Sequence, residues 1–189
     1  MALSDVALAS RALIRIGSAP ITSFSDGTAE AEVAGALFAP VRDGLLSAYG
    51  WRFATGQVAL NQLSTPPLAD YAYAFGLPTD FLRALSAGVG GRGRGLNYRI
   101  ARGALHTHAP EVVLTYIFRP EEEEFPPYFD QALIARLSAE FTIPVTENTS
   151  RAEVNFRLAD REFEKARQID AAQDTPHKIE RFNLIDVRG

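Results

Sequence analysis

Residues 28–60 constrain the fold most, because a helical pattern there runs directly into a strand pattern. Apolar residues recur four apart, which places them on one buried face of a helix. They are Val33, Leu37, Val41 and Leu45, with Phe38 and Leu46 widening the stripe. Gly50 stops the helical pattern, and the strand pattern opens at Trp51. We therefore expect a helix whose end packs against a sheet, with Trp51 and Phe53 at the join.

Four segments carry helical patterns with recognisable ends. They cover residues 2–16, 28–49, 127–143 and 151–172. Thr28 is a suitable N-cap for the second helix. Pro40 should kink or split that helix, and Pro144 should close the third. Ser150 and Glu153 match a capping box, which places the start of the fourth helix there.

A β subdomain is expected over residues 52–119, between the second and third helices. Aromatic residues alternate there with small ones, which is the period of a half-buried strand. They are Tyr71, Tyr73 and Phe75. A hairpin with its turn at Arg102 and Gly103 is also expected. Residues 88–95 are too glycine-rich to order by themselves and predict a flexible loop. The predicted fold class is α+β, a mainly α-helical bundle with one inserted small antiparallel β-sheet. It forms a single domain over residues 1–174, followed by an extended C-terminal tail over 175–189.

Composition excludes several classes of site. With 189 residues, 47% of them hydrophobic, the chain can bury a single core. It contains no cysteine, so it has neither disulfides nor thiolate chemistry. Its net charge of -4 gives no overall attraction to nucleic acid. No apolar run is long enough to span a membrane, so no membrane partner is expected.

Catalytic and cofactor patterns are weak. His106 and His108 lie two apart, so on a strand both face the same side and could begin a metal site. The spacing places no third ligand beside them. The glycine-rich segment 88–95 lacks the lysine and the serine or threonine that end a phosphate-binding loop. We therefore predict neither a cofactor nor an enzymatic activity.

Several short motifs occur in a particular order along the chain. Arg42 and Asp43 precede the leucine pair Leu45 and Leu46, and Trp51 and Phe53 follow. A leucine-proline-x-aspartate turn comes next, followed by leucine and arginine: Leu77, Pro78, Asp80, Leu82 and Arg83. Residues 125–146 then form a long helical segment. This order resembles the head-to-tail adaptor (connector) family of tailed phages, which includes the tail tubular protein A of short-tailed phages. The likeness covers about residues 5–174.

The resemblance implies a structural protein rather than an enzyme. Such adaptors form a ring of twelve subunits under the portal protein, extend the DNA channel and offer a platform to the next tail component, a stopper or nozzle. DNA passes through without specific binding. The implied location is the head-tail interface of a virion or of a gene transfer agent particle, assembled in the host cytoplasm. The sequence leaves short-tailed phage, long-tailed phage and gene transfer agent open.

The tail over residues 175–189 keeps large apolar residues without a helical pattern, whereas a free terminus is normally more polar. We expect it to dock on the portal protein, as adaptors of this family commonly do. The expected docking residues are Ile179, Arg181, Phe182, Leu184, Ile185 and Val187. The alternative is that the tail packs on its own domain.

Two charged segments are expected to contact neighbouring proteins. The loop over residues 88–102 carries four arginines, for which a neighbouring ring is the expected partner: Arg92, Arg94, Arg99 and Arg102. The alternatives are a solvated loop or contact with channel DNA. The last helix has a thin apolar face of Val154, Phe156, Ala159, Phe163, Ala166 and Ile169. Its charged side is expected to meet the next subunit through Arg157, Asp160, Arg161 and Glu164, with a solvated helix as the alternative.

Two further interpretations stay open at this point. The acidic residues 121–124 are expected to form a solvated link, and the alternative is that they face a basic patch on the next subunit. For the whole chain, the alternatives to an adaptor are a small soluble enzyme with a basic lid loop and a DNA-binding accessory protein. Turnover or a bound metal would favour the enzyme, and salt-dependent DNA retention would favour the DNA-binding protein.

Overall fold

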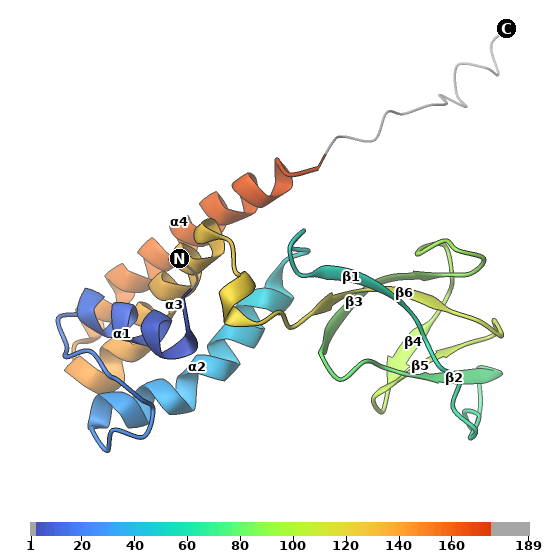
Figure 1. The fold of residues 1–189 in the computed structure, drawn as a ribbon, viewed down its shortest axis with the longest axis horizontal. Coiled ribbons are helices and arrows are strands. Elements are labelled where there is room, and N and C mark those ends of the chain that lie inside the picture. The colour runs from blue at the N-terminus through green and yellow to red at the C-terminus, as the bar shows by residue number, and fades with distance from the viewer. Residues whose placement is uncertain (1–2, 175–189) are drawn as a thin grey trace, which may run out of the picture.

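The computed structural model describes residues 3–174, which form four α-helices and two three-stranded antiparallel sheets. The predicted α+β class is confirmed. Figure 1 shows two lobes, with the helices gathered in one and the strands in the other. The chain crosses between the lobes twice, after α2 and again after β6 (Figure 1). The predicted tail over residues 175–189 lies outside the described residues.

The helical lobe is built around one central helix. Its elements are α1 (Asp5–Arg15), α2 (Ala29–Ala48), α3 (Pro127–Thr146) and α4 (Thr149–Ala171). Helix α3 packs against each of the other three helices. It supplies the most apolar surface to the core, where Phe129, Leu133 and Phe141 are fully buried. Removing this much apolar surface from water is the main stabilising contribution to the lobe.

Helix ends follow the sequence in part. The hydroxyl of Thr28 accepts from the backbone N–H of Ala31 at 3.2 Å, so the predicted cap of α2 is confirmed. Of the two outcomes predicted at Pro40, a kink or a split, the split is wrong, because α2 continues through it as one helix. Pro144 does not close α3, which runs on to Thr146. A proline removes only one intrahelical hydrogen bond, and the buried Phe141 holds this turn against the core.

The start of α4 differs from the capping-box prediction. Asn148 is the N-cap, and its side-chain oxygen accepts from the backbone N–H of Arg151 at 2.9 Å. The helix therefore begins at Thr149 rather than after Ser150. Just before it, Glu147 ends α3 with a positive φ of 53°. The connection between α3 and α4 is short, so Asn148 lies next to the exposed N–H groups of the first turn of α4. Asparagine is as good an N-cap as serine.

The buried face of α2 agrees with the prediction in part. The buried residues are Ala31, Ala34, Phe38 and Leu46, of which Phe38 and Leu46 were predicted. The predicted stripe of Val33, Leu37, Val41 and Leu45 flanks this face and is only partly buried against the same core. The helix is therefore rotated so that its small residues point inward, because alanines let α2 approach its neighbours closely.

The β lobe contains two sheets rather than the single sheet that was predicted. One has the order β1 (Thr55–Ala59), β6 (Val113–Phe118), β3 (Phe81–Gly88), and the other β2 (Tyr73–Gly76), β5 (Ala104–Thr107), β4 (Arg99–Ala101). Alternation in a sequence identifies a strand but not its partner, which explains the difference. Phe75 of one sheet and Leu114 of the other are fully buried and belong to the same core. The expected hairpin turn at Arg102 and Gly103 is confirmed, with φ of 52° and 72°.

Trp51 joins the two lobes, as the sequence predicted. It is fully buried, and its indole N–H donates to the carbonyl of Leu45 at 3.1 Å. Its ring meets the ring of Phe129 edge-on at 5.1 Å, and Phe53 packs on the same Phe129 ring at 5.0 Å. The path from α2 into β1 is thereby fixed by an aromatic cluster with a satisfied polar group. In the part of the chain that the structure describes, no helix is long and apolar enough to cross a membrane.

Candidate interaction surfaces

A charged network holds the second connection between the lobes. The carboxylate of Asp43 on α2 accepts from Arg119, just after β6, with the shortest contact at 2.6 Å. It also accepts from the neighbouring Arg42 at 2.9 Å, and Arg42 pairs in turn with Glu122 of the 3-10 helix η1 (Glu122–Glu124). Burial opposes ionisation of Asp43, but the hydrogen bonds from Arg119 and Arg42 outweigh it and lower its pKa below 3.8.

The arginine-aspartate motif of residues 42 and 43 therefore has a structural role in the described part of the chain. It ties α2 to the segment that leads from β6 into α3. A bidentate arginine-carboxylate pair fixes orientation as well as distance. The angle between the two lobes is consequently held by polar contacts on one side and by the Trp51 cluster on the other.

A second polar node lies at the end of α4, where the described part of the chain finishes. The Asp170 carboxylate is completely buried. It accepts from the backbone N–H of Arg52 at 3.0 and 3.1 Å and from the hydroxyl of Tyr128 at 2.8 Å. Burial and the hydrogen bond to Asp170 raise the pKa of Tyr128 well above its ordinary value. The exposed pair of Arg52 and Asp174, 3.4 Å apart, lies beside this node.

Sequence reasoning missed Asp170 as a buried residue, although a signal was present. The buried residues Ala152, Ala159 and Ala166 of α4 lie seven apart, and Phe156, Phe163 and Asp170 form a second series of the same spacing. Asp170 thus occupies the inward position that phenylalanine fills in the preceding turns of the same series. The predicted stripe instead included Val154 and Ile169, which are 47% and 38% exposed. That part of the prediction is wrong.

The four residues predicted to meet a neighbouring subunit lie along one side of α4. Arg157 pairs with Glu153 at 3.9 Å, and Glu164 pairs with Arg167 at 2.8 Å. Asp160 reaches across to Arg136 of α3 at 3.9 Å, whereas Arg161 has no ion pair within residues 3–174. Asp160, Arg161 and Glu164 line one shallow hollow on this helix. The structure therefore brings the predicted set together on an exposed, mixed-charge face.

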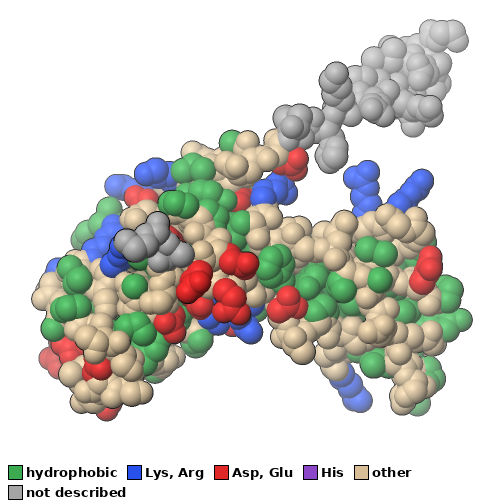
Figure 2. All heavy atoms as spheres, viewed as in Figure 1, with side chains coloured by type: hydrophobic (Ala, Val, Ile, Leu, Met, Phe, Trp, Pro, Cys, Tyr) green, Lys and Arg blue, Asp and Glu red, His purple; other side chains and the backbone are tan. Residues whose placement is uncertain are grey.

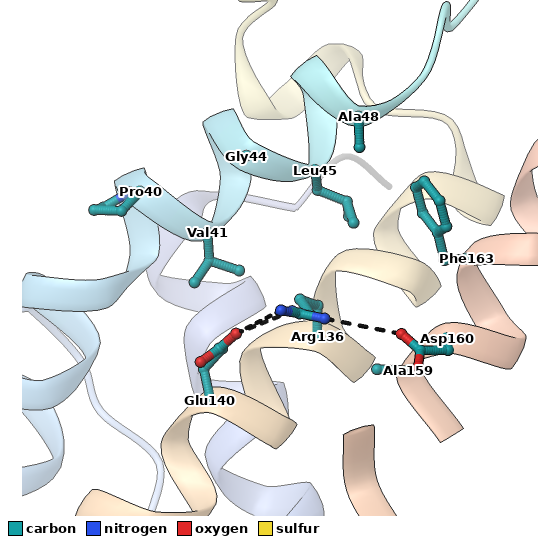
Figure 3. A pocket seen from close by; sticks show the side chains of 10 residues that line it. All are labelled: Pro40, Val41, Gly44, Leu45, Ala48, Arg136, Glu140, Ala159, Asp160 and Phe163. Atoms are coloured by element: carbon teal, nitrogen blue, oxygen red, sulfur yellow. Dashed lines mark hydrogen bonds and ion pairs between the residues drawn. The ribbon is translucent and has the colours of Figure 1, made fainter. Parts of the chain in front are cut away.

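An open groove that the sequence did not predict lies between α2, α3 and α4. Figure 3 shows Val41 and Leu45 of α2 on one side and Phe163 of α4 on the other. Arg136 lies across the floor, 2.9 Å from Glu140 and 3.9 Å from Asp160 (Figure 3). The groove has a volume of about 470 Å³. Its walls are apolar, and the charged side chains on its floor are paired with one another.

The glycine-rich loop between β3 and β4 is more ordered than predicted. The carbonyl of Gly93 accepts from the hydroxyls of Ser86 at 2.6 Å and Thr115 at 3.1 Å. Further along, the backbone N–H of Leu96 donates to the carbonyl of Ala87 at 2.9 Å. The predicted loop is confirmed, and polar side chains of the neighbouring strands, which the glycine content did not predict, bind its backbone.

The four arginines of this segment do not lie in one place. Arg92 and Arg94 line a hollow over the sheet of β1, β6 and β3. Arg99 lies on β4, where it pairs with Asp70 at 3.3 Å and stacks over the ring of Tyr71. Arg102 sits in the β4–β5 turn and is exposed. Only Arg92 and Arg94 therefore share a site.

The two histidines that were considered as the start of a metal site, His106 and His108, lie on β5 and just after it. The ring of Tyr71 lies 6.4 Å from that of His106 and 5.3 Å from that of His108. Within residues 3–174 no group of three or more histidine, aspartate or glutamate side chains is arranged to hold a metal ion. The two histidines therefore extend the aromatic surface around Tyr71 and Arg99.

The chain was compared with models of known protein families and with curated proteins. No protein-family model matches the chain. No curated protein matches its sequence either. The tail residues Ile179, Arg181, Phe182, Leu184, Ile185 and Val187, predicted to dock on a portal protein, lie outside the described residues.

Proposed function

We propose that this protein is a structural head-to-tail adaptor subunit of a phage or phage-like particle. In this proposal it forms a ring under the portal protein, extends the DNA channel and supports the next tail component. The observation that carries the proposal is the outer side of α4, where Arg157, Asp160, Arg161 and Glu164 form an exposed face of mixed charge. The order of sequence motifs that resembles the adaptor family supports it as well.

Ring formation requires that one face of a subunit meet a different face of the next. A face of mixed charge suits such a contact, because it pairs with a different face whose charges are complementary. The neighbouring groove between α2 and α4 offers apolar walls that could receive a side chain from the next subunit. In the proposal, the helical lobe is a bundle that forms the body of the ring.

The remaining parts of the proposal concern partners. The extended tail over residues 175–189 docks on the portal. The conformational entropy lost when the tail becomes ordered there is offset by burying Phe182 and its apolar neighbours. The loop arginines Arg92, Arg94, Arg99 and Arg102 meet neighbouring proteins. DNA passes through the channel without specific binding, and the net charge of -4 per chain suits that role. The particle is a virion or a gene transfer agent, and assembly takes place in the host cytoplasm.

Co-purification with the portal protein tests this function. The full-length chain and a version that stops at Asp174 are each mixed with the portal, and the capture of both is compared. We expect the full-length chain to be largely monomeric alone and to form rings on the portal, and the shortened chain to lose capture. Equal capture of both chains would move the contact from the tail to the ring body, and no capture of either would refute the adaptor function.

Charge reversal tests the helical face separately. Arg157→Glu together with Arg161→Glu should abolish rings on the portal, because a complementary contact becomes a like-charge contact. Arg15→Glu on α1 is the matched control, since Arg15 is also exposed and has no ion pair within the described residues. Rings that form equally well with the reversed α4 face would show that subunits meet elsewhere.

A further inference from the structure

The hollow over the sheet of β1, β6 and β3 is lined by polar and basic groups. Its walls are Gln57, Ser86, Arg92, Gly93, Arg94 and Thr115, and its volume is about 900 Å³. In residues 3–174 neither the Arg92 nor the Arg94 side chain takes part in an ion pair or hydrogen bond, and both are exposed. Cationic side chains project from the β lobe in Figure 2. Two guanidinium groups are thus available to an acidic ligand.

Two glycines fix the loop in the position that creates this hollow. A Cβ atom added at Gly88 would lie 2.0 Å from the carbonyl oxygen of Arg92, which is backbone that cannot rotate away. A Cβ atom at Gly93 would lie 2.4 Å from the hydroxyl oxygen of Thr115. Only glycine permits such close approach. The loop backbone is therefore held against the sheet, and Arg92 and Arg94 are presented from a defined platform.

The same chain carries a complementary acidic turn on another part of its surface. Glu121, Glu123 and Glu124 are exposed on and beside η1, and within the described residues none of them forms an ion pair. Glu122 alone is used internally, by Arg42. Figure 2 shows acidic side chains gathered between the two lobes. The unused carboxylates of this turn outnumber the two unused guanidinium groups of the hollow.

We infer that the hollow with Arg92 and Arg94 receives the acidic turn around Glu123 of a second copy of this chain. The contact is heterologous, because the hollow and the turn are different surfaces. Arginine forms two parallel hydrogen bonds to a carboxylate, so each guanidinium group fits one glutamate. The inference rests on the proposed function, in which copies assemble, and adds the pair of surfaces through which copies on the portal meet at the β lobe.

Nucleic acid is the competing ligand, and the charges disfavour it. The affinity of a protein for DNA rises with the number of phosphates that its basic side chains neutralise. The hollow offers two arginines, on a chain whose net charge is -4. A short acidic turn needs no more cations than the hollow supplies.

Cross-linking between copies tests the inference directly. The chain has no cysteine, so single cysteines introduced at Arg94 and at Glu123 are the only thiols present. A paired arginine and glutamate hold their Cα atoms farther apart than a disulfide reaches, about 4–7 Å, so a short bismaleimide linker is used. Copies with Arg94→Cys are mixed with copies with Glu123→Cys on the portal and free at high concentration. The matched control replaces Arg94→Cys with Arg102→Cys.

We expect the 94–123 pair to cross-link into dimers and the 102–123 pair to remain monomeric. Equal cross-linking of both pairs, or none for the 94–123 pair, would overturn the inference. Portal capture without this cross-link would leave the proposed function standing and remove only this interface. Loss of portal capture, with the cross-link kept in free protein, would support this interface and contradict the proposed function.

Charge reversal gives an independent readout. Arg92→Glu with Arg94→Glu, and Glu121→Arg with Glu123→Arg, should each weaken self-association at least about tenfold, and mixing the two variants should restore it. Gly88→Ala keeps every charge but displaces the loop, so it should weaken association as well. The inference fails if mixing does not restore association, or if Arg92→Glu with Arg94→Glu instead abolishes salt-dependent retention of duplex DNA.

Discussion

The two lobes bury their aromatic side chains to different extents. In the helical lobe and at its join with the β lobe, Trp51, Phe129 and Phe141 are fully buried. In the β lobe only Phe75 is fully buried, while most other aromatic side chains of its core are partly exposed. Large apolar residues there also face water, with Leu68 fully exposed in the loop before β2. The β lobe thus has a small buried core from which loops extend, whereas the helical lobe has a large one.

Because of this difference, we expect the two lobes to contribute unequally to the stability of the protein. Each apolar Å² removed from water contributes about 25 cal/mol, so the helical lobe contributes more of the folding free energy. The β lobe relies more on backbone pairing and on polar contacts such as those of Ser86 and Thr115 with Gly93. Regions with few buried apolar contacts open at lower free energy. We therefore expect the β lobe to open locally while the helical lobe stays folded.

Removing the central aromatic ring of the helical lobe should have the largest effect. Phe129→Ala leaves a cavity beside Trp51 and Phe53, so it should lower the free energy of unfolding by about 4 kcal/mol. Urea denaturation followed by the fluorescence of Trp51, the single tryptophan, measures the change. The counterpart in the β lobe is Phe75→Ala, which should cost about 3 kcal/mol within that lobe.

The two variants together test whether the lobes unfold separately. Phe75→Ala should speed hydrogen exchange in β2 and β5, where Phe75 pairs with Leu105, and shift the Trp51 transition less than half as far as Phe129→Ala does. Equal shifts of the Trp51 transition would contradict the comparison, since they would show one cooperative unit.

The buried carboxylate of Asp170 should have the next largest effect. Asp170→Ala leaves the Tyr128 hydroxyl and the Arg52 N–H without their acceptor, which should lower stability by about 2–3 kcal/mol. Asp170→Asn keeps an acceptor oxygen and should cost about 1 kcal/mol. Asp174→Asn is the matched control, because its exposed ion pair with Arg52 should contribute less than about 1 kcal/mol. Similar losses for Asp170→Ala and Asp174→Asn would show that the buried node contributes little.

The smallest expected effect is a gain in stability from Asp130→Asn on α3. Burial raises the pKa of Asp130 from 3.8 to about 6, and one of its oxygens is buried without a partner in the described structure. Between these two values the folded state keeps a proton that the unfolded chain has lost, so stability falls as pH rises through this window. The amide that replaces the carboxyl group in this variant carries no charge at any pH in the window.

Asp130→Asn should therefore stabilise the protein by up to about 1 kcal/mol at pH 7.5, a figure reduced for its partial exposure, and by little near pH 4. Urea denaturation at both pH values measures this. Asp43 offers the opposite sign, because its lowered pKa gives stability that is lost as pH falls through that lowered value. An Asp130→Asn gain that is equal at both pH values would show that the charge is not responsible.

Much of the fold follows from local patterns. The positions of the four helices, the Thr28 cap, the Arg102–Gly103 turn and the join at Trp51 were all predicted, and all are confirmed. Each of these depends on residues close together in the chain, so periodicity and capping chemistry suffice. Of the candidate sites, the sequence placed the charged residues of α4 on one exposed side, while their proposed contact with a neighbouring subunit stays a prediction.

Local patterns did not predict the arrangements between distant residues. The division into two sheets, the burial of Asp170 against Arg52 and Tyr128, and the attachment of Gly93 to Thr115 each join segments far apart in sequence. A local pattern cannot rank such contacts, because a strand with a given alternation pairs equally well with several partners. Local sequence patterns predict the helices and strands and the types of residue at their surfaces. Packing decided which surfaces became the core, the groove and the basic hollow.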